Sequence, residues 1–228
     1  MSADIIPAIL PISFEDLEEK LALVKGAFKS VHVDVSDGRF TPNLTFPFRP
    51  EDKEHFERIK KEEEGLPFWQ NFDFELHCMT ETPGRYVEEW VRAGASRIIA
   101  HIETVTDFPL LKREVGDLTE LGLAVLYDTP LEKIDPYIDE IQSVQLMSIA
   151  KVGYQGQNFE EGIYERITML RQKYPELTIS VDGGVNLENT PKLIKAGANR
   201  LVVGSAIFES ENIAETIEDF KKFLNYNF

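Results

Sequence analysis

The sequence predicts a closed (β/α)8 barrel that forms a single domain over residues 1–228. Strand-like and helix-like segments alternate from end to end, eight of each are found, and the length is typical of one such barrel. Parallel strands need helical crossovers, and closing the sheet removes its edges. The alternative is an open doubly wound sheet, which usually carries a glycine-rich fingerprint after its first strand; none follows "PAIL" at 7–10.

Short apolar or alternating runs predict the eight strands. They cover residues 4–10, 30–36, 72–79, 96–103, 123–128, 144–150, 177–183 and 200–207. Between them, apolar residues recur at helical spacing. The expected helices begin at Ser13, cover 51–65, open at Thr82, cover about 107–120, begin at Thr129, lie near 161–173, end at Gly197 and cover 212–224.

Local signals predict several helix ends. Ser13 with Asp16 matches a capping box, and so does the segment 129–132. The charged helix over 51–65 is expected to stop at its final glycine, Gly65. A weak repeat, "AGASRII" and "AGANRLV", places a helix-ending glycine before a new strand in both halves of the chain.

Composition limits the classes of partner and compartment. Asp and Glu number 40 against 24 Lys and Arg, a formal charge of −16, which argues against nucleic acid and anionic membranes as partners. The lone Cys78 excludes an internal disulfide. The first residues lack the pattern of a signal peptide, and no apolar run is long enough to span a membrane. We therefore expect a cytoplasmic protein.

Several chemistry-bearing side chains fall near the carboxyl ends of the predicted strands, which form the active face of such barrels. They are His32, Asp34, His77, His101, Glu103, Lys151 and Asp182. The fourth histidine, His55, lies on the charged helix, where we expect it to be solvated.

Two imidazoles and two carboxylates converging from three strands would suit one divalent ion, Zn, Fe, Mn or Co. The candidate residues are His32, Asp34, His77 and Asp182. The alternative is a set of buried, hydrogen-bonded polar groups unrelated to a metal. Any one of the four taken alone favours that alternative, whereas four at equivalent depth favour a metal.

A second signal lies after strands seven and eight. "VDGGVN" and "VGSA" place Gly184, Gly204 and Ser205 where barrels commonly hold a phosphate through backbone N–H groups and a helix N-terminus. Ordinary tight turns are the alternative explanation of these small residues.

With these motifs in view, the chain resembles the ribulose-phosphate 3-epimerases along essentially its whole length. The matching motifs, in the family's order, are "HVDVSDGRFTPN", "HCM", "HIE", "GYQGQ", "VDGG" and "VGSAIF". The resemblance implies a metal-dependent enzyme that inverts C3 of a ketose phosphate. The expected reaction interconverts D-ribulose 5-phosphate and D-xylulose 5-phosphate, or a closely related pair.

The resemblance also implies roles for particular residues. One divalent metal ion per chain would be held by His32, Asp34, His77 and Asp182, with no organic cofactor. Asp34 and Asp182 would also transfer protons, one on each face of the substrate. Substrate or phosphate would be bound by Gly153, Gly156, Gly184, Gly204 and Ser205. A homo-oligomer is implied as well.

Some positions depart from the family pattern. Ala8 stands where the family has serine, Ser36 where it has methionine, and the segment 127–128 where it has Asn-Pro. The loop "AKVGYQGQ" is one residue longer than its family counterpart and carries Lys151 and Gln155. The class of reaction is therefore better supported than the exact sugar.

Two other functions stay open at this point. Lys151 follows strand six, where some barrel aldolases place a Schiff-base lysine, and burial there would lower its pKa. A non-catalytic sugar-phosphate-binding relative is the second. The retention of Asp34 and Asp182 counts against it, because a binding protein has no need of two opposed acids.

Overall fold

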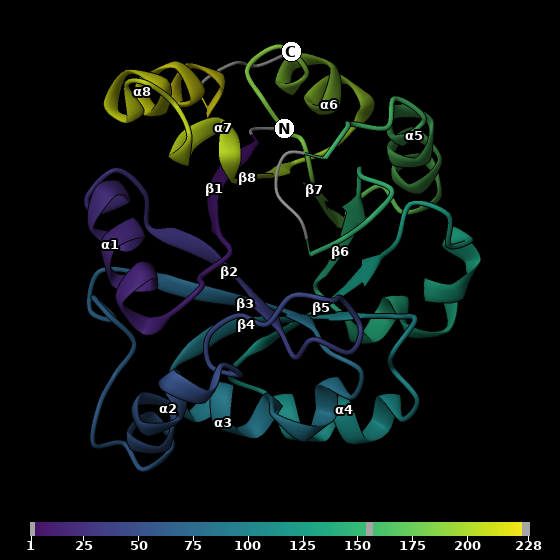
Figure 1. Cartoon of the computed structure of the whole chain (residues 1–228). Helices are drawn as coiled ribbons and strands as arrows, with labels where there is room; N and C mark the ends of the chain where they lie inside the picture. Colours follow the sequence, from purple (N-terminus) through teal and green to yellow (C-terminus); the bar gives the residue numbers. More distant parts are fainter. Residues whose placement is uncertain (1–2, 154–156, 225–228) are drawn as a thin grey trace. The chain divides into compact units, whose positions relative to one another are not determined.

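The computed structural model describes residues 3–153 and 157–224 (Figure 1). Its strands are β1 Asp4–Ile9, β2 Ser30–Ser36, β3 Asp73–Met79, β4 Ala95–His101, β5 Glu120–Val125, β6 Ser143–Met147, β7 Thr178–Asp182 and β8 Arg200–Val203. They follow one another in the sheet in chain order, and the sheet closes. The predicted (β/α)8 barrel is thereby confirmed.

Helices alternate with these strands. They are α1 Phe14–Val24, η1 Pro50–Asp52, α2 Lys53–Lys60, η2 Pro83–Arg85, α3 Val87–Arg92, α4 Phe108–Val115, η3 Leu131–Glu140, α5 Ile163–Lys173, α6 Thr190–Ala196, α7 Ser205–Phe208 and α8 Ile213–Leu224. The elements labelled η are 3-10 helices. No helix of the described segments combines the length and apolarity that crossing a membrane requires.

The chain divides into two compact units. The first-half unit is Ala8–Gly122, and the second-half unit is Met1–Pro7 with Leu123–Phe228. In the first-half unit β2, β3 and β4 pair in parallel, and Figure 1 shows α2, α3 and α4 on one side of β3 and β4. In the second-half unit β6, β7 and β8 pair in parallel, and β8 pairs with the start of β1.

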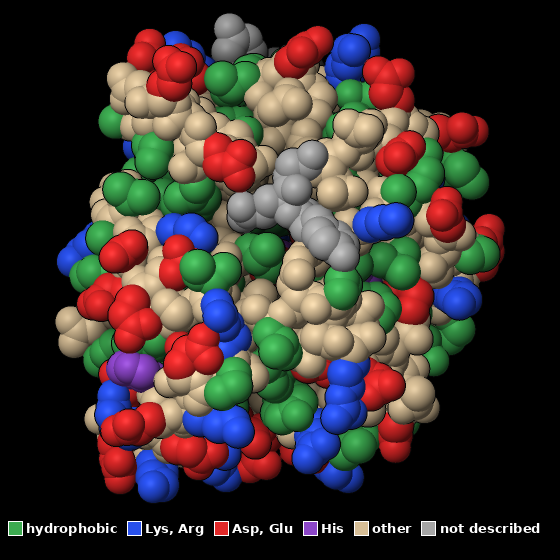
Figure 2. All heavy atoms as spheres, viewed as in Figure 1, with side chains coloured by type: hydrophobic (Ala, Val, Ile, Leu, Met, Phe, Trp, Pro, Cys, Tyr) green, Lys and Arg blue, Asp and Glu red, His purple; other side chains and the backbone are tan. Residues whose placement is uncertain are grey.

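The apolar pattern explains the packing of the first-half unit. Val31, Val33 and Val35 alternate along β2 and are buried, so one face of the strand packs into the core. In α1, Leu17 and Leu21 lie four residues apart and are fully buried on the inner face of the helix. Asp and Glu side chains are spread across the face drawn in Figure 2, interspersed with Lys and Arg.

The helix signals are confirmed at three positions. The Ser13 hydroxyl accepts a hydrogen bond from the N–H of Asp16 at 3.1 Å, as a cap should. The reciprocal half of the box differs, because the Asp16 carboxylate accepts from the N–H of Ile12 at 2.9 Å. Gly94 and Gly197 both have positive φ, of 92° and 117°, which glycine adopts without steric cost.

The C-terminal end predicted for the charged helix over 51–65 is wrong. The helix ends at Lys60, and Glu62 already has a φ of 60°, so the chain has left the helix before Gly65 is reached. The run of charged residues is helix-compatible in composition, but its tail has no apolar residue to bury, and tertiary packing supplies most helical stability.

Two further predictions near β5 are wrong. The helix expected over 107–120 stops at Val115, where Gly116 has a φ of 70°, and β5 begins at Glu120. The capping box over 129–132 does not form, because the N-cap residue of η3 is Pro130, whose side chain cannot accept a hydrogen bond.

Packing of α1 can be tested with two leucines of the same helix. Leu17 is fully buried and Leu23 is 54% exposed. Leu17→Ala is expected to lower the free energy of unfolding by about 2–5 kcal/mol, because it removes buried methyl groups and leaves a cavity. Leu23→Ala should change it by less than about 0.5 kcal/mol. Urea unfolding, followed by fluorescence and circular dichroism together, measures both; equal losses would contradict the packing described here.

Candidate active site

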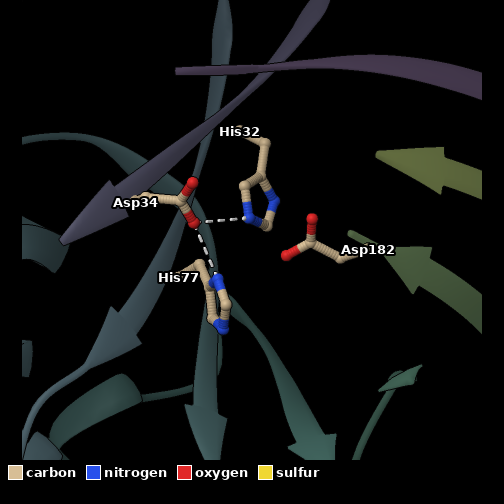
Figure 3. A group of neighbouring side chains, drawn as sticks. All are labelled: His32, Asp34, His77 and Asp182. Carbon is tan, nitrogen blue, oxygen red and sulfur yellow. Dashed lines mark hydrogen bonds and ion pairs between the residues drawn. The ribbon is translucent and has the colours of Figure 1, made fainter. Parts of the chain in front are cut away.

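Parallel pairing of β2 with β3 builds the centre of the candidate site. The register places Asp34 opposite His77 and His32 opposite Glu75. Side chains two apart on a strand share a face, so His32 and Asp34 point away from the buried valines of β2. Both histidines are fully buried, and one possible ligand atom from each of His32, Asp34 and His77 lies within 4.8 Å of the others (Figure 3).

Hydrogen bonds and ion pairs tie these three side chains together. Asp34 Oδ1 lies 2.8 Å from Nδ1 of His77 and 3.4 Å from Nε2 of His32. The second ring nitrogens have partners too: Nδ1 of His32 lies 2.8 Å from the Glu75 carboxylate, and Nε2 of His77 lies 2.9 Å from Nε2 of His101. Each imidazole is therefore oriented through both of its nitrogens.

The electrostatics of the cluster follow from burial and these contacts. Burial opposes the charged form of His32, but hydrogen bonds to Asp34 and Glu75 outweigh it and raise the pKa of His32 to about 10. Burial likewise opposes an ionised Asp34, yet hydrogen bonds from His32 and His77 hold the pKa of Asp34 below its ordinary value. Asp34 is thus a carboxylate at neutral pH, available as a ligand or as a base.

His101 and Glu103, both among the predicted active-face residues, extend the cluster. Burial lowers the pKa of His101 to about 4, although its hydrogen bond to Glu103 acts in the opposite direction. Nδ1 of His101 lies 3.3 Å from the Glu103 carboxylate. His101 is therefore a neutral imidazole behind His77, and the aromatic ring of Phe40 packs against it with 4.6 Å between ring centroids.

Asp182 belongs to the second-half unit and ends β7. Its Oδ2 accepts a hydrogen bond from Nε2 of Gln145 at 3.0 Å, and its backbone carbonyl accepts one from the N–H of Ser148 at 2.8 Å. Asp182 is the fourth residue labelled in Figure 3 and is a candidate metal ligand through its carboxylate. This donor set fits a divalent transition ion, since imidazole and carboxylate both suit Zn, Fe, Mn and Co.

The glycines after β7 have structural reasons of their own. Gly183 and Gly184 have φ of 110° and 64°. A Cβ on Gly183 would lie 2.8 Å from the side chain of Ile149, and one on Gly184 would lie 3.2 Å from Cβ of Phe159. A tight turn in close contact with its neighbours accounts for both residues, so their part in phosphate binding stays a prediction.

The other predicted phosphate and substrate residues are placed only in part. Gly204 follows β8 and precedes the single turn α7, which starts at Ser205. Gly153, with a φ of 84°, is buried in the connection after β6. Gly156 and Gln155 lie outside the described residues.

The structure bears on two other residues singled out in the sequence, Lys151 and His55. Lys151 is exposed, whereas a Schiff-base lysine relies on burial to lower its pKa. His55 is not merely solvated: its ring stacks on Phe14 with 4.1 Å between centroids, and Nδ1 lies 3.1 Å from the Glu64 carboxylate.

The residues that depart from the family pattern have local partners. Buried Ser36 shares a hydrogen bond of 2.5 Å with the Thr41 hydroxyl and donates one to the carbonyl of Asn43 at 2.6 Å, so it ties down the loop after β2. Asp37 shapes the same turn by accepting a hydrogen bond from the N–H of Arg39 at 3.0 Å. Ala8 is buried and lies opposite His32 in the pairing of β1 with β2.

Sequence reasoning missed two polar residues of these strands. Glu75 contacts His32, and Gln145 contacts Asp182. Glu75 lies two residues before His77 on β3, and Gln145 lies two residues before Met147 on β6. Side chains two apart on a strand share a face, so alternation along the strands indicates that both residues point inward with the site. A polar residue inside an otherwise apolar strand was the available signal, because burial without a partner is costly.

A closed barrel with imidazole and carboxylate donors near the strand ends is compatible with an enzyme that acts on a small molecule with the help of a metal ion. Comparison with known proteins makes the class more specific. The sequence model of the "Ribulose-phosphate 3 epimerase family" matches residues 4–208. "Ribulose-phosphate 3-epimerase" from Synechocystis sp. is 35% identical over 95% of this chain and 93% of the relative, and that from Schizosaccharomyces pombe is 31% identical over 97% and 93%.

The chain belongs to the ribulose-phosphate 3-epimerase family. It is accordingly an enzyme, an isomerase of the class that epimerises carbohydrates. Among solved structures, 3-hexulose-6-phosphate synthase from Salmonella typhimurium is similar with a TM-score of 0.66, covering 98% of each chain at 15% identity. This likeness concerns the fold alone.

Metal binding by the cluster can be measured directly. His77→Ala is expected to weaken Zn²⁺ or Mn²⁺ binding at least tenfold (about 10–100-fold or more), because it removes one imidazole donor. His55→Ala is the matched control, since it removes a histidine outside the cluster and should leave affinity within about twofold. Competition with a chromophoric chelator gives both values. Equal affinity of the two variants would contradict the assignment of His77.

Proposed function

We propose that the chain is a metal-dependent sugar-phosphate 3-epimerase that interconverts D-ribulose 5-phosphate and D-xylulose 5-phosphate, or a closely related pair of ketose phosphates. Membership of the family supports the reaction class. The observation that carries the proposal is the contact of the Asp34 carboxyl group with two buried histidines, which hold its pKa below the ordinary value. Such a group combines the properties of a metal ligand and of a general base.

The ion would be held by His32, Asp34, His77 and Asp182. A bound divalent ion supplies positive charge beside the substrate oxygens on which negative charge develops when a proton next to a ketone is removed. Other residues of the chain orient these ligands. Glu75 contacts His32, His101 contacts His77, and Gln145 donates a hydrogen bond to the carboxylate of Asp182.

Inversion requires two proton-transfer groups, one on each face of the substrate carbon. We assign Asp34 and Asp182 to these roles. One carboxylate removes the C3 proton and the other returns a proton from the opposite side. The exchange involves no change in oxidation state, so no organic cofactor is called for.

Phosphate binding is assigned to Gly184, Gly204 and Ser205, together with Gly153 and Gly156 of the loop after β6. Gly184 has no Cβ and adopts a positive φ, and the small side chains of Gly204 and Ser205 likewise permit close approach of an anion to the backbone.

Three further properties belong to the same proposal. We propose that the chain acts as a single barrel domain, as a homo-oligomer and in the cytoplasm. A rice relative at 31% identity is named a cytoplasmic isoform and an Arabidopsis relative at 34% identity is named chloroplastic, so the family occupies more than one compartment.

Isotope exchange tests the two aspartates. Asp182→Asn is expected to abolish inversion, yet to leave slow exchange of the C3 proton with solvent from one epimer, because Asp34 still works from its own face. Asp34→Asn should show the mirrored pattern with the other epimer. The measurement is deuterium uptake at C3 in ²H₂O, followed by NMR for each epimer separately.

Both aspartates are also assigned as metal ligands, so metal content is measured in each variant before its kinetics are compared. Asp37→Asn is the matched control, because Asp37 shapes the turn after β2 through backbone contacts and should retain inversion. Near-native inversion by metal-loaded Asp34→Asn and Asp182→Asn would contradict the two-acid mechanism.

The phosphate assignment has its own test. Gly204→Asp is expected to raise the KM for the sugar phosphate at least tenfold (about 1.4 kcal/mol or more) without removing the metal, because it introduces a negative charge beside the bound anion. Gly84→Asp adds the same charge in η2 and should leave KM unchanged. Equal turnover of phosphorylated and unphosphorylated sugars would contradict the assignment.

A further inference from the structure

A row of charged side chains crosses the first-half unit one layer away from Asp34 and His77. The strand registers place His32 opposite Glu75 and Glu75 opposite Arg97, so three neighbouring strands each contribute one residue. Glu75 Oε1 lies 2.8 Å from Nδ1 of His32, and its Oε2 accepts from Nη1 of Arg97 at 2.9 Å. Arg97 in turn donates from Nε to Glu120 at 2.8 Å, at the outer end of the row.

Burial makes this row costly to build. Glu75 is 2% exposed, and a buried carboxylate needs charged or hydrogen-bonding partners to stay ionised. Its two oxygens face two different donors, the ring of His32 and the guanidinium of Arg97. A carboxylate accepts on both sides, whereas an amide of the same shape accepts on one side only.

The consequence for His32 follows from the chemistry of imidazole. A ring that binds a metal through one nitrogen carries its proton on the other, and a carboxylate acceptor fixes which nitrogen that is. Glu75 takes the proton-bearing Nδ1, which leaves Nε2 of His32 on the side of Asp34. Arg97 holds the carboxylate in this position from behind.

We propose that Glu75 is a positioning residue for metal binding: it fixes the Nδ1–H form of His32, and Arg97 orients Glu75. This inference rests on the proposed metal site and adds residues to it that lie outside the ligand set. A purely structural role for the row is the competing explanation, and it predicts a loss of stability without a loss of metal affinity in the folded protein.

Two double variants separate these explanations. Glu75→Gln with Arg97→Leu keeps an acceptor oxygen for His32 and removes the second donor. Glu75→Leu with Arg97→Leu removes the acceptor as well, so the two proteins carry the same charge and differ only at position 75. Because both proteins replace Arg97 with leucine, neither contains an arginine that has lost its carboxylate partner, and this favours folding of both.

The expected result is that the Glu75→Leu, Arg97→Leu protein binds Zn²⁺ at least tenfold (about 10–100-fold) more weakly than the Glu75→Gln, Arg97→Leu protein. Affinity is measured by chelator competition, and thermal melting of the metal-free proteins reports stability separately. Glu120→Gln is the control, because Glu120 contacts Arg97 at the half-exposed end of the row, and it should stay within about twofold of the unchanged protein.

Equal affinity of the two double variants would overturn the positioning role, even if both melt at lower temperature. A failure of the unchanged protein to bind any divalent ion would overturn the proposed function and this inference with it, so the two failures are distinguishable. A second measurement needs no variant: the Zn²⁺-loaded protein should show a slowly exchanging Nδ1–H signal for His32 in long-range ¹H–¹⁵N spectra. Protonation at Nε2 instead would overturn the inference.

Discussion

The contact of the Asp34 carboxylate with two buried imidazoles is the interaction on which the candidate site depends. Nδ1 of His77 lies at 2.8 Å and Nε2 of His32 at 3.4 Å from the same oxygen. In a buried environment a carboxylate is retained only with such partners. The requirement explains why β2 and β3 must pair in this register, since a shift of one residue would turn His32 and Asp34 into the apolar layer.

A second layer of polar groups supports that contact. Glu75 and Arg97 lie behind His32, while His101 and Glu103 lie behind His77. Each imidazole is therefore part of a chain of hydrogen bonds, which limits ring rotation and selects the nitrogen available to a ligand. Preorganised donors of this kind suit metal-assisted proton transfer, because little reorganisation is needed when charge develops on the substrate.

Helix ends were less well predicted than strands, and particular residues show why. The charged, helix-compatible composition predicts a helix over 51–65, but the chain leaves the helix before Glu62, where no apolar side chain remains to be buried. The segment 129–132 matches a capping box by residue type alone, whereas the N-cap of the 3-10 helix that follows is Pro130, which has no side-chain acceptor. The existence and order of the strands were more reliable, since buried apolar residues such as Val33 and Leu76 are needed by the core. Strand ends were less so: the strand expected over 200–207 ends at Val203, and a helix begins at Ser205.

The sequence by itself determined the barrel class, the reaction family and the identity of the residues in the cluster. Alternation of strands and helices prescribes the topology, and His32, Asp34, His77 and Asp182 can be read from motifs. Only the tertiary structure decided how these groups are held. That Glu75 meets His32, that His101 meets His77 and that Gln145 meets Asp182 depends on the register between strands far apart in the chain. Hydrophobic alternation shows which face of a strand each of these side chains occupies, but it does not name the partner across the sheet, because that depends on how the paired strands pack together.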